Sequence, residues 1–158
     1  MAGCVKAMKS PSHPTIDERT GMSLNNQLTV DFPLLMRQAL ASAAVTQACS
    51  CIITPLHAWT AQPLTLELDC FEAAGTLLDD PYDEPTFAEY HPAGTRYDSP
   101  DAPIAPRFYP TNRCSVACCT RCSRHYLRYN EAGGYFTELR IRALQPDLLV
   151  DAPAPDRP

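Results

Sequence analysis

The chain has 158 residues, of which 45% are hydrophobic and 20% charged, and this suits one domain with a single core. Its net charge of −5 argues against a protein that coats nucleic acid. It lacks the run of about 18 apolar residues that a membrane span needs, and its polar N-terminus lacks the apolar region of a secretory signal. We therefore expect a cytoplasmic protein with no membrane partner.

The N-terminal part is expected to be a loose tail followed by one helix. Residues 1–28 are polar without a sustained period, and Met22 is an alternative start to Met1. A helix is predicted from about residue 32, because Asp31 can cap it and Pro33 is tolerated in a first turn. Its expected apolar face contains Phe32, Leu35, Met36, Ala39, Leu40 and Ala43.

Two short strands are predicted after the helix. Residues 49–54, "CSCIIT", contain β-branched side chains, which are typical of strands. Residues 63–69, "PLTLELD", alternate leucines with polar residues, and this pattern predicts a half-buried strand.

Residues 78–112 form a proline-rich stretch whose aromatic content favours a wrapping loop over disorder. Charge is divided between this part of the chain and the part that follows. Residues 67–101 contain ten acidic side chains and one basic side chain, whereas residues 107–142 contain seven arginines and two glutamates. Either the acidic loop covers the arginines within the molecule, or the arginines bind an anionic partner.

Residues 126–143 predict a β-hairpin around the three-residue loop Ala132–Gly134. That loop pairs Tyr129 with Thr137, because a two- or four-residue loop would mix apolar and charged faces. The expected buried face contains Leu127, Tyr129, Tyr135, Leu139 and Ile141. The arginines Arg128, Arg140 and Arg142 are then expected on the opposite, exposed face.

The cysteines of residues 114–122 indicate a metal site. Cys119-Thr-Arg-Cys122 before a hairpin is typical of a zinc knuckle, in which a tight turn aims two thiolates at one ion. The expected ligands of Zn²⁺ are Cys119, Cys122, Cys51 and Cys114. Alternatives for the last two places are Cys49, Cys118 and His125.

Three other interpretations of these cysteines remain open. Cys114-x4-Cys119-x2-Cys122 has the spacing of plant-type [2Fe–2S] ferredoxins, although their fourth cysteine follows downstream. A redox-active Cys-x-x-Cys is a second interpretation, but that motif normally begins a helix. Unligated buried thiols are the third.

The stretches "SCIITPLHAWTAQPLTLELD", "DDPYDEPTFAEYHP" and "CTRCSRHYLRYNEAGGYFTELRIRAL" carry a resemblance over residues 30–145. The chain resembles a family of small uncharacterised bacterial proteins, and its hairpin is similar to zinc-ribbon modules. The resemblance implies one intact domain, includes the acidic proline-rich stretch in the fold, and implies no activity. It departs from zinc ribbons by lacking a standard second knuckle.

We therefore expect an α+β domain over residues 29–147, in which one N-terminal helix packs on a small antiparallel sheet. Residues 113–144 form its zinc-ribbon-like knuckle and hairpin, and residues 148–158 form a disordered tail. The expected function is non-enzymatic zinc binding with a protein partner. One alternative is a nucleic-acid or anion-binding zinc module that uses Arg121, Arg124, Arg128, Arg140 and Arg142. The other is a thiol redox enzyme.

Overall fold

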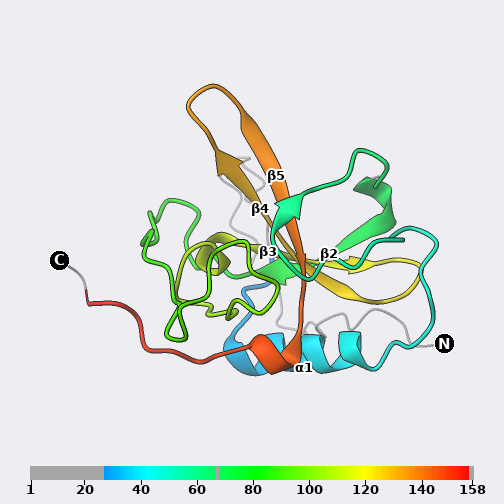
Figure 1. The fold of residues 1–158 in the computed structure, drawn as a ribbon, viewed down its shortest axis with the longest axis horizontal. Coiled ribbons are helices and arrows are strands. Elements are labelled where there is room, and N and C mark those ends of the chain that lie inside the picture. Colours follow the sequence, from blue (N-terminus) through cyan, green and yellow to red (C-terminus); the bar gives the residue numbers. More distant parts are fainter. Residues whose placement is uncertain (1–26, 67, 157–158) are drawn as a thin grey trace, which may run out of the picture.

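A computed structural model describes residues 27–66 and 68–156. Within them the chain forms one α-helix and a five-stranded antiparallel sheet of order β1-β5-β4-β3-β2 (Figure 1), so the predicted α+β class is confirmed. The elements are α1 (Phe32–Ala43), β1 (Thr60–Ala61), β2 (Phe71–Thr76), β3 (Ser115–Cys119), β4 (His125–Ala132) and β5 (Thr137–Ala143), with short 3-10 helices η1 (Leu68–Cys70), η2 (Thr111–Arg113) and η3 (Pro146–Leu148). No helix in the described part of the chain is long and apolar enough to cross a membrane. All but the last two residues of the expected tail 1–28 fall outside the described residues.

Helix α1 begins as predicted. The Asp31 carboxylate accepts a hydrogen bond from the N–H of Leu34 at 2.9 Å, and a proline occupies the first turn. Its buried face is rotated from the expected one, since Leu40 is exposed while Gln38 and Ser42 are buried. The rotation gives each polar side chain a hydrogen bond: the Gln38 amide N–H donates to a carbonyl of β2 at 3.1 Å, and the Ser42 hydroxyl accepts from the first N–H of β4 at 2.9 Å.

The two strands predicted after the helix do not form. Residues 49–54 are irregular, and residues 63–66 make a turn in which the N–H of Leu66 donates to Pro63 at 2.9 Å. Only Leu66 of the three alternating leucines is buried, whereas Leu64 and Leu68 are exposed. A turn that buries Leu66 alone accommodates the alternating leucines, so their alternation with polar residues did not require a strand. The strand at this edge of the sheet is instead β1, which pairs with β5.

The predicted hairpin forms as β4 and β5, but the predicted register is wrong. The observed Cα partners are Tyr129 with Arg140, Leu127 with Arg142, and Ala132 with Thr137. The loop has four residues, 133–136, and the N–H of Gly133 donates to the carbonyl of Phe136 at 2.8 Å. The aromatic side chains of Tyr135 and Phe136 are 102% and 72% exposed at the protruding tip (Figure 1), so they add nothing to the core.

The changed register exchanges the two faces of β5. Arg140 and Arg142 now share a face with Leu127 and Tyr129, because directly paired residues point to the same side of a sheet. Ile141 moves to the opposite face. Arg142 is consequently only 1% exposed, although an exposed position was predicted for it.

Buried apolar side chains form three clusters in the described residues, and two of them bear on the site. The larger one includes α1 and buried side chains such as Leu35, Trp59, Ile104, Val116, Leu127 and Tyr129. The smaller one lies beneath the segment that follows α1 and contains Leu56, Leu66, Cys119, Tyr126 and Ile141. Helix α1 lies at the end of the sheet opposite the tip of the hairpin (Figure 1). Cys119, the last residue of β3, lies inside the smaller core.

The chain between β2 and η2 contains turns and an isolated bridge but no helix or strand. Ile104 fixes this segment to the C-terminal part of the chain: its N–H donates to Leu148 at 2.7 Å, and its carbonyl accepts from Val150 at 3.0 Å. Ala152 is also buried, and Arg107 forms an ion pair with Asp151 at 2.6 Å. Residues 148–152 are therefore packed, contrary to the expected disordered tail, because their apolar side chains complete this contact.

Candidate metal centre

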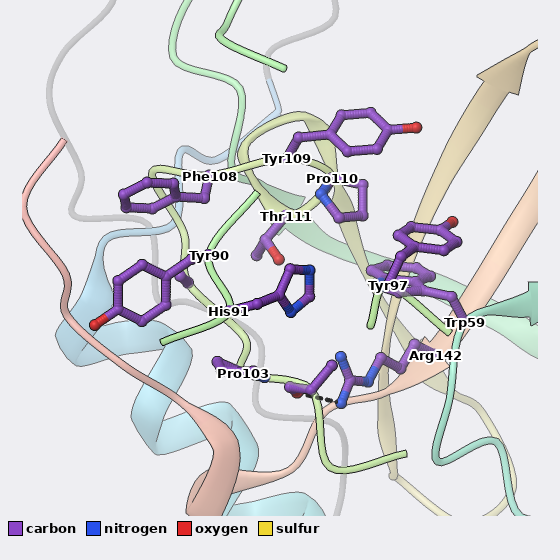
Figure 2. Close-up of a pocket in the computed structure, with 12 residues that line it drawn as sticks. Trp59, Tyr90, His91, Tyr97, Pro103, Phe108, Tyr109, Pro110, Thr111 and Arg142 are labelled. Atoms are coloured by element: carbon purple, nitrogen blue, oxygen red, sulfur yellow. Dashed lines mark hydrogen bonds between the residues drawn. The ribbon is translucent and has the colours of Figure 1, made fainter. Parts of the chain in front are cut away.

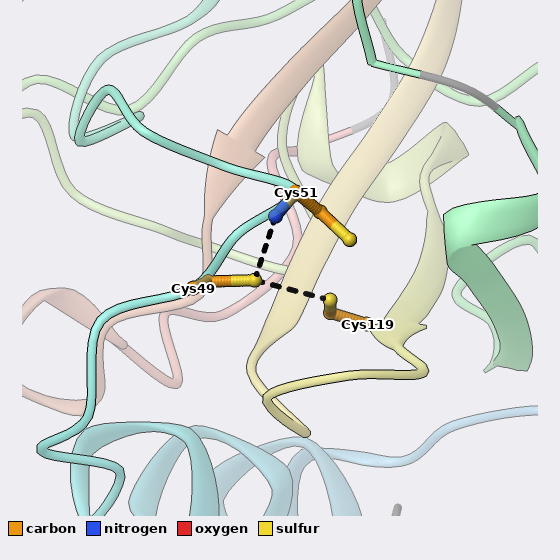
Figure 3. Close-up of side chains that lie close together, drawn as sticks. All are labelled: Cys49, Cys51 and Cys119. Carbon is orange, nitrogen blue, oxygen red and sulfur yellow. Dashed lines mark hydrogen bonds between the residues drawn. The ribbon is translucent and has the colours of Figure 1, made fainter.

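Three cysteine sulfurs meet beside the smaller core. The Sγ atoms of Cys49, Cys51 and Cys119 all lie within 4.8 Å of one another, and the Cys49 and Cys119 sulfurs are 3.6 Å apart (Figure 3). Cys49 and Cys51 come from the irregular segment after α1, and Cys119 comes from the end of β3. Two segments distant in the sequence thus bring their thiols to one point.

The Cys-x-x-Cys turn places a fourth thiol, that of Cys122, beside this group. The N–H of Cys119 donates to the carbonyl of Arg124 at 2.8 Å, and the N–H of Ser123 donates to the carbonyl of Cys119 at 2.9 Å. Ser123 has a φ of 66°, a left-handed conformation that turns the chain back into β4. Cys122 then packs against the same core as Cys49 and Cys119, and these two thiols contribute to the raised pKa of Cys122.

The arginines of the turn hold the opposite segment in place. Arg121 donates to the Ser50 hydroxyl at 3.3 Å, and Arg124 donates to the carbonyl of Val45 at 3.0 Å. Farther along, the carbonyl of Leu56 accepts a 2.6 Å hydrogen bond from β5. These contacts fix the ends of an irregular segment that lacks a strand of its own, and they leave its cysteines facing the turn.

The local backbone favours a thiolate at Cys49. Burial raises the pKa of this thiol, but the N–H groups of Ile52 and Cys51 and the thiols of Cys122 and Cys119 outweigh burial and lower the pKa to about 7. The N–H of Cys51 lies 3.4 Å from the Cys49 sulfur (Figure 3). N–H groups aimed at a thiolate stabilise its charge, as they do in a zinc knuckle.

The neighbouring thiols show the opposite shift. Burial, the Cys70 thiol and the charges of Cys119 and Cys49 raise the pKa of Cys51 to about 12. Burial and the two thiols beside it raise the pKa of Cys122 to about 11. The thiols therefore resist carrying several negative charges together, and a bound cation would remove that cost by neutralising them.

The separation of the sulfurs fits a single ion. Four sulfurs placed tetrahedrally at about 2.3 Å from zinc are about 3.8 Å apart. The 3.6 Å separation of Cys49 and Cys119 is close to that value, and all three sulfurs of the group lie within 4.8 Å. An all-thiolate donor set favours zinc or another soft metal over magnesium or calcium.

Cys114, one of the four expected ligands, does not reach this group. It is fully buried in the larger core, and its S–H donates to the carbonyl of Pro110 at 3.2 Å. The backbone is extended from Cys114 through β3, so residues five positions apart point to opposite faces and lie roughly 16 Å apart. The ferredoxin-like spacing that includes Cys114 is therefore not assembled in space.

Two of the alternative ligands also lie elsewhere. Cys118 and His125 pair across β3 and β4, on the face opposite Cys119. His125 is buried, and within the described residues neither of its ring nitrogens has a hydrogen-bond partner. Burial lowers its pKa. Cys49, the remaining alternative, does join the group, and its Cys-x-Cys spacing with Cys51 is the sequence signal that identifies it.

A second concave region lies beneath the long loop. Figure 2 shows Arg142, His91, Trp59 and Tyr97 around a narrow pocket. Arg142 donates to three backbone carbonyls, those of His57, Pro100 and Ala102, at 3.0, 3.3 and 2.6 Å. The His91 nitrogens lie 2.9 Å from the Thr95 hydroxyl and 2.8 Å from the Glu89 carboxylate. These polar groups are already paired within the chain. We therefore interpret the region as the contact that joins the loop to the sheet, and not as a binding site.

The arginines expected to form one anion-binding face do not share a face, and each makes a different kind of contact within the protein. Arg142 is buried, and Arg140 pairs with Glu131 and Glu138 at 2.7 and 2.8 Å. Arg128 lies over the ring of Phe71 on the other face of the sheet. The acidic loop does cover an arginine, but through the backbone carbonyls that Arg142 binds and not through its carboxylates.

Comparison with known proteins adds no relative. The chain matches no protein-family profile, no curated protein and no solved structure.

Proposed function

We propose that the protein binds one zinc ion through Cys49, Cys51, Cys119 and Cys122, and that this ion has a structural role. The observation that carries the proposal is the meeting of Cys49, Cys51 and Cys119 sulfurs from two distant segments within 4.8 Å. Cys122 is the proposed fourth ligand because it packs against the same core and its pKa responds to the thiols of both Cys49 and Cys119. The Cys70 thiol raises the pKa of Cys51, whereas the main causes of the pKa shifts of Cys49 and Cys122 do not include it, and this makes Cys70 the weaker choice.

The ion would fasten the irregular segment 45–57 to the sheet. This segment covers the smaller core but has no regular secondary structure. Zinc that joins Cys49 and Cys51 to the knuckle would supply the cross-link, much as a disulfide closes a loop in an oxidising compartment. Four thiolate ligands leave no open coordination position, so the proposed ion is structural and not catalytic.

We place the protein in the cytoplasm, where thiols stay reduced and available to zinc. Its action is proposed to run through contacts with another protein. The exposed aromatic side chains of Tyr135 and Phe136 at the tip of the hairpin support a protein partner, because aromatic residues are enriched at interfaces. Nucleic acid is disfavoured, because Arg142 is buried and Arg140 is paired within its own hairpin.

Native mass spectrometry and elemental analysis of the untagged full chain test the proposal. We expect one zinc per chain in the wild type, loss of zinc in Cys51→Ser and Cys122→Ser, and retention in Cys114→Ser. The last variant is the matched control, since the Cys114 thiol is bonded elsewhere. Each variant is checked for folding by circular dichroism. A metal-free wild-type monomer that is fully folded would refute the proposal.

A thiol redox enzyme is the second candidate function. The lowered pKa of Cys49, at about 7, favours it, because the thiolate is the reactive form of cysteine. The metal-free chain would then reduce a small disulfide substrate catalytically, and added zinc would inhibit it. Elemental analysis separates the two candidates, because a redox enzyme of this kind would be isolated without zinc.

A further inference from the structure

A fifth thiol, that of Cys70, lies beside the proposed zinc site. Cys70 ends η1 and precedes Phe71, which pairs with Cys119 across β2 and β3. Its carbonyl accepts two hydrogen bonds from Thr120, at 2.9 Å from the N–H and at 3.2 Å from the hydroxyl. The backbone of Cys70 is therefore fixed to the knuckle.

The Cys70 thiol is directed at one particular cysteine of the group. Cys70 and Cys51 pack against the same smaller core, and the Cys70 thiol helps to raise the pKa of Cys51. Cys70 is also partly exposed to solvent, unlike the fully buried Cys119, so a small solute can reach it. Tetrahedral zinc takes four sulfurs, and Cys70 then remains as an unligated thiol next to a ligand.

We propose that Cys70 makes the zinc site sensitive to peroxide, by forming a disulfide with Cys51 that releases the ion. This inference rests on the proposed zinc site. Cys70 is then not a structural ligand but the partner that resolves oxidation. Loss of Cys51 leaves three thiolates for the metal and detaches the irregular segment 45–57 from the knuckle.

The reaction balances with hydrogen peroxide as the oxidant. The Cys70 thiolate attacks one peroxide oxygen, the O–O bond breaks, and the leaving hydroxide takes a proton to become water. The resulting sulfenic acid is attacked by the Cys51 sulfur, an S–S bond forms, and a second water leaves. Two sulfurs lose two electrons in total, peroxide gains them, and zinc remains Zn²⁺.

Zinc release from the zinc-loaded full chain measures the effect. Wild type and Cys70→Ser receive equal hydrogen peroxide, a chromogenic chelator follows the free zinc, and peptide mapping with an alkylating reagent identifies the disulfide. We expect equal zinc content before treatment, and release about tenfold slower in Cys70→Ser, because a positioned second thiol speeds disulfide closure. We also expect a Cys51–Cys70 disulfide in the wild type and recovery of zinc binding after reduction.

Three outcomes would overturn the switch. One is equal release from both proteins, and another is a disulfide mapped to Cys119–Cys122 in place of Cys51–Cys70. The third is loss of zinc from folded Cys70→Ser before any peroxide is added, since that would make Cys70 a ligand. The zinc content before treatment separates failure of the switch from failure of the proposed function. Wild type that carries no zinc at the outset would refute the proposed function itself.

Discussion

Replacing Arg142 by methionine tests the observed hairpin register directly. Arg142 is 1% exposed, and its guanidinium donates to the carbonyls of His57, Pro100 and Ala102. Hydrogen bonds from charged donors contribute roughly 1.5–3 kcal/mol each, so the carbonyls left without a donor cost about 5 kcal/mol. Burial lowers the pKa of Arg142 to about 10, which corresponds to about 3 kcal/mol of unfavourable charge burial.

The net loss is smaller than the hydrogen bonds alone suggest, because the variant no longer buries a charge. We expect Arg142→Met to lower the free energy of unfolding by about 2 kcal/mol. Arg140→Met is the matched control. Its partners are two glutamates, and its side chain is 27% exposed. Its loss should stay at about 1 kcal/mol or less, as is usual for ion pairs that are open to solvent.

Urea unfolding followed by tryptophan fluorescence measures both values, since Trp59 is the single tryptophan and lies beside Arg142 in the same pocket. Trypsin cleavage after Arg96 gives a second readout, because Arg142 holds the carbonyls of residues 100 and 102 just beyond that site. Cleavage should be faster in Arg142→Met alone. Equal losses below about 0.5 kcal/mol in both variants, typical of exposed sites, would refute the observed register in favour of the one predicted from sequence.

Three further predictions concern single residues. Gly75→Ala should destabilise the fold by about 3 kcal/mol in urea unfolding, because φ is +136° and an added Cβ would lie 2.8 Å from the carbonyl oxygen of Leu28. Gly94→Ala is the control: φ is +74° but the space around the added Cβ is open, so the loss should be about 1 kcal/mol. A smaller loss at Gly75 than at Gly94 would contradict this. Ser123→Val should weaken zinc binding in a competition titration with a chelator, since a β-branched residue is strained at a φ of 66°; unchanged affinity would count against the knuckle geometry. His125→Leu should keep its zinc and lose stability less steeply than the wild type as the pH falls. Burial lowers the pKa of His125 below 6.5, so the wild type loses stability as the pH falls from 6.5 toward that lower pKa, and the variant lacks this loss. Parallel pH profiles for the two proteins would refute the last prediction.

Much of the local structure follows from the sequence alone. Asp31, Pro33 and the apolar period predict α1, because a cap and helical spacing act within a few residues. The Cys119–Cys122 pair before two aromatic-rich stretches predicts a tight turn that leads into a hairpin, and both the turn and the hairpin form. These features depend on contacts between neighbours in the chain, which the sequence lists directly.

The register of the hairpin and the composition of the cysteine group depended on tertiary structure. The buried position of Arg142 is possible only because a distant loop supplies three carbonyls, and no local pattern shows that a charged side chain will find them. The same holds for the thiols. Strand alternation turns Cys114 away from Cys119, whereas the segment after α1 folds back to bring Cys49 and Cys51 to the knuckle. Which cysteines meet was therefore decided by packing between segments about 70 residues apart, and sequence spacing alone does not contain that information.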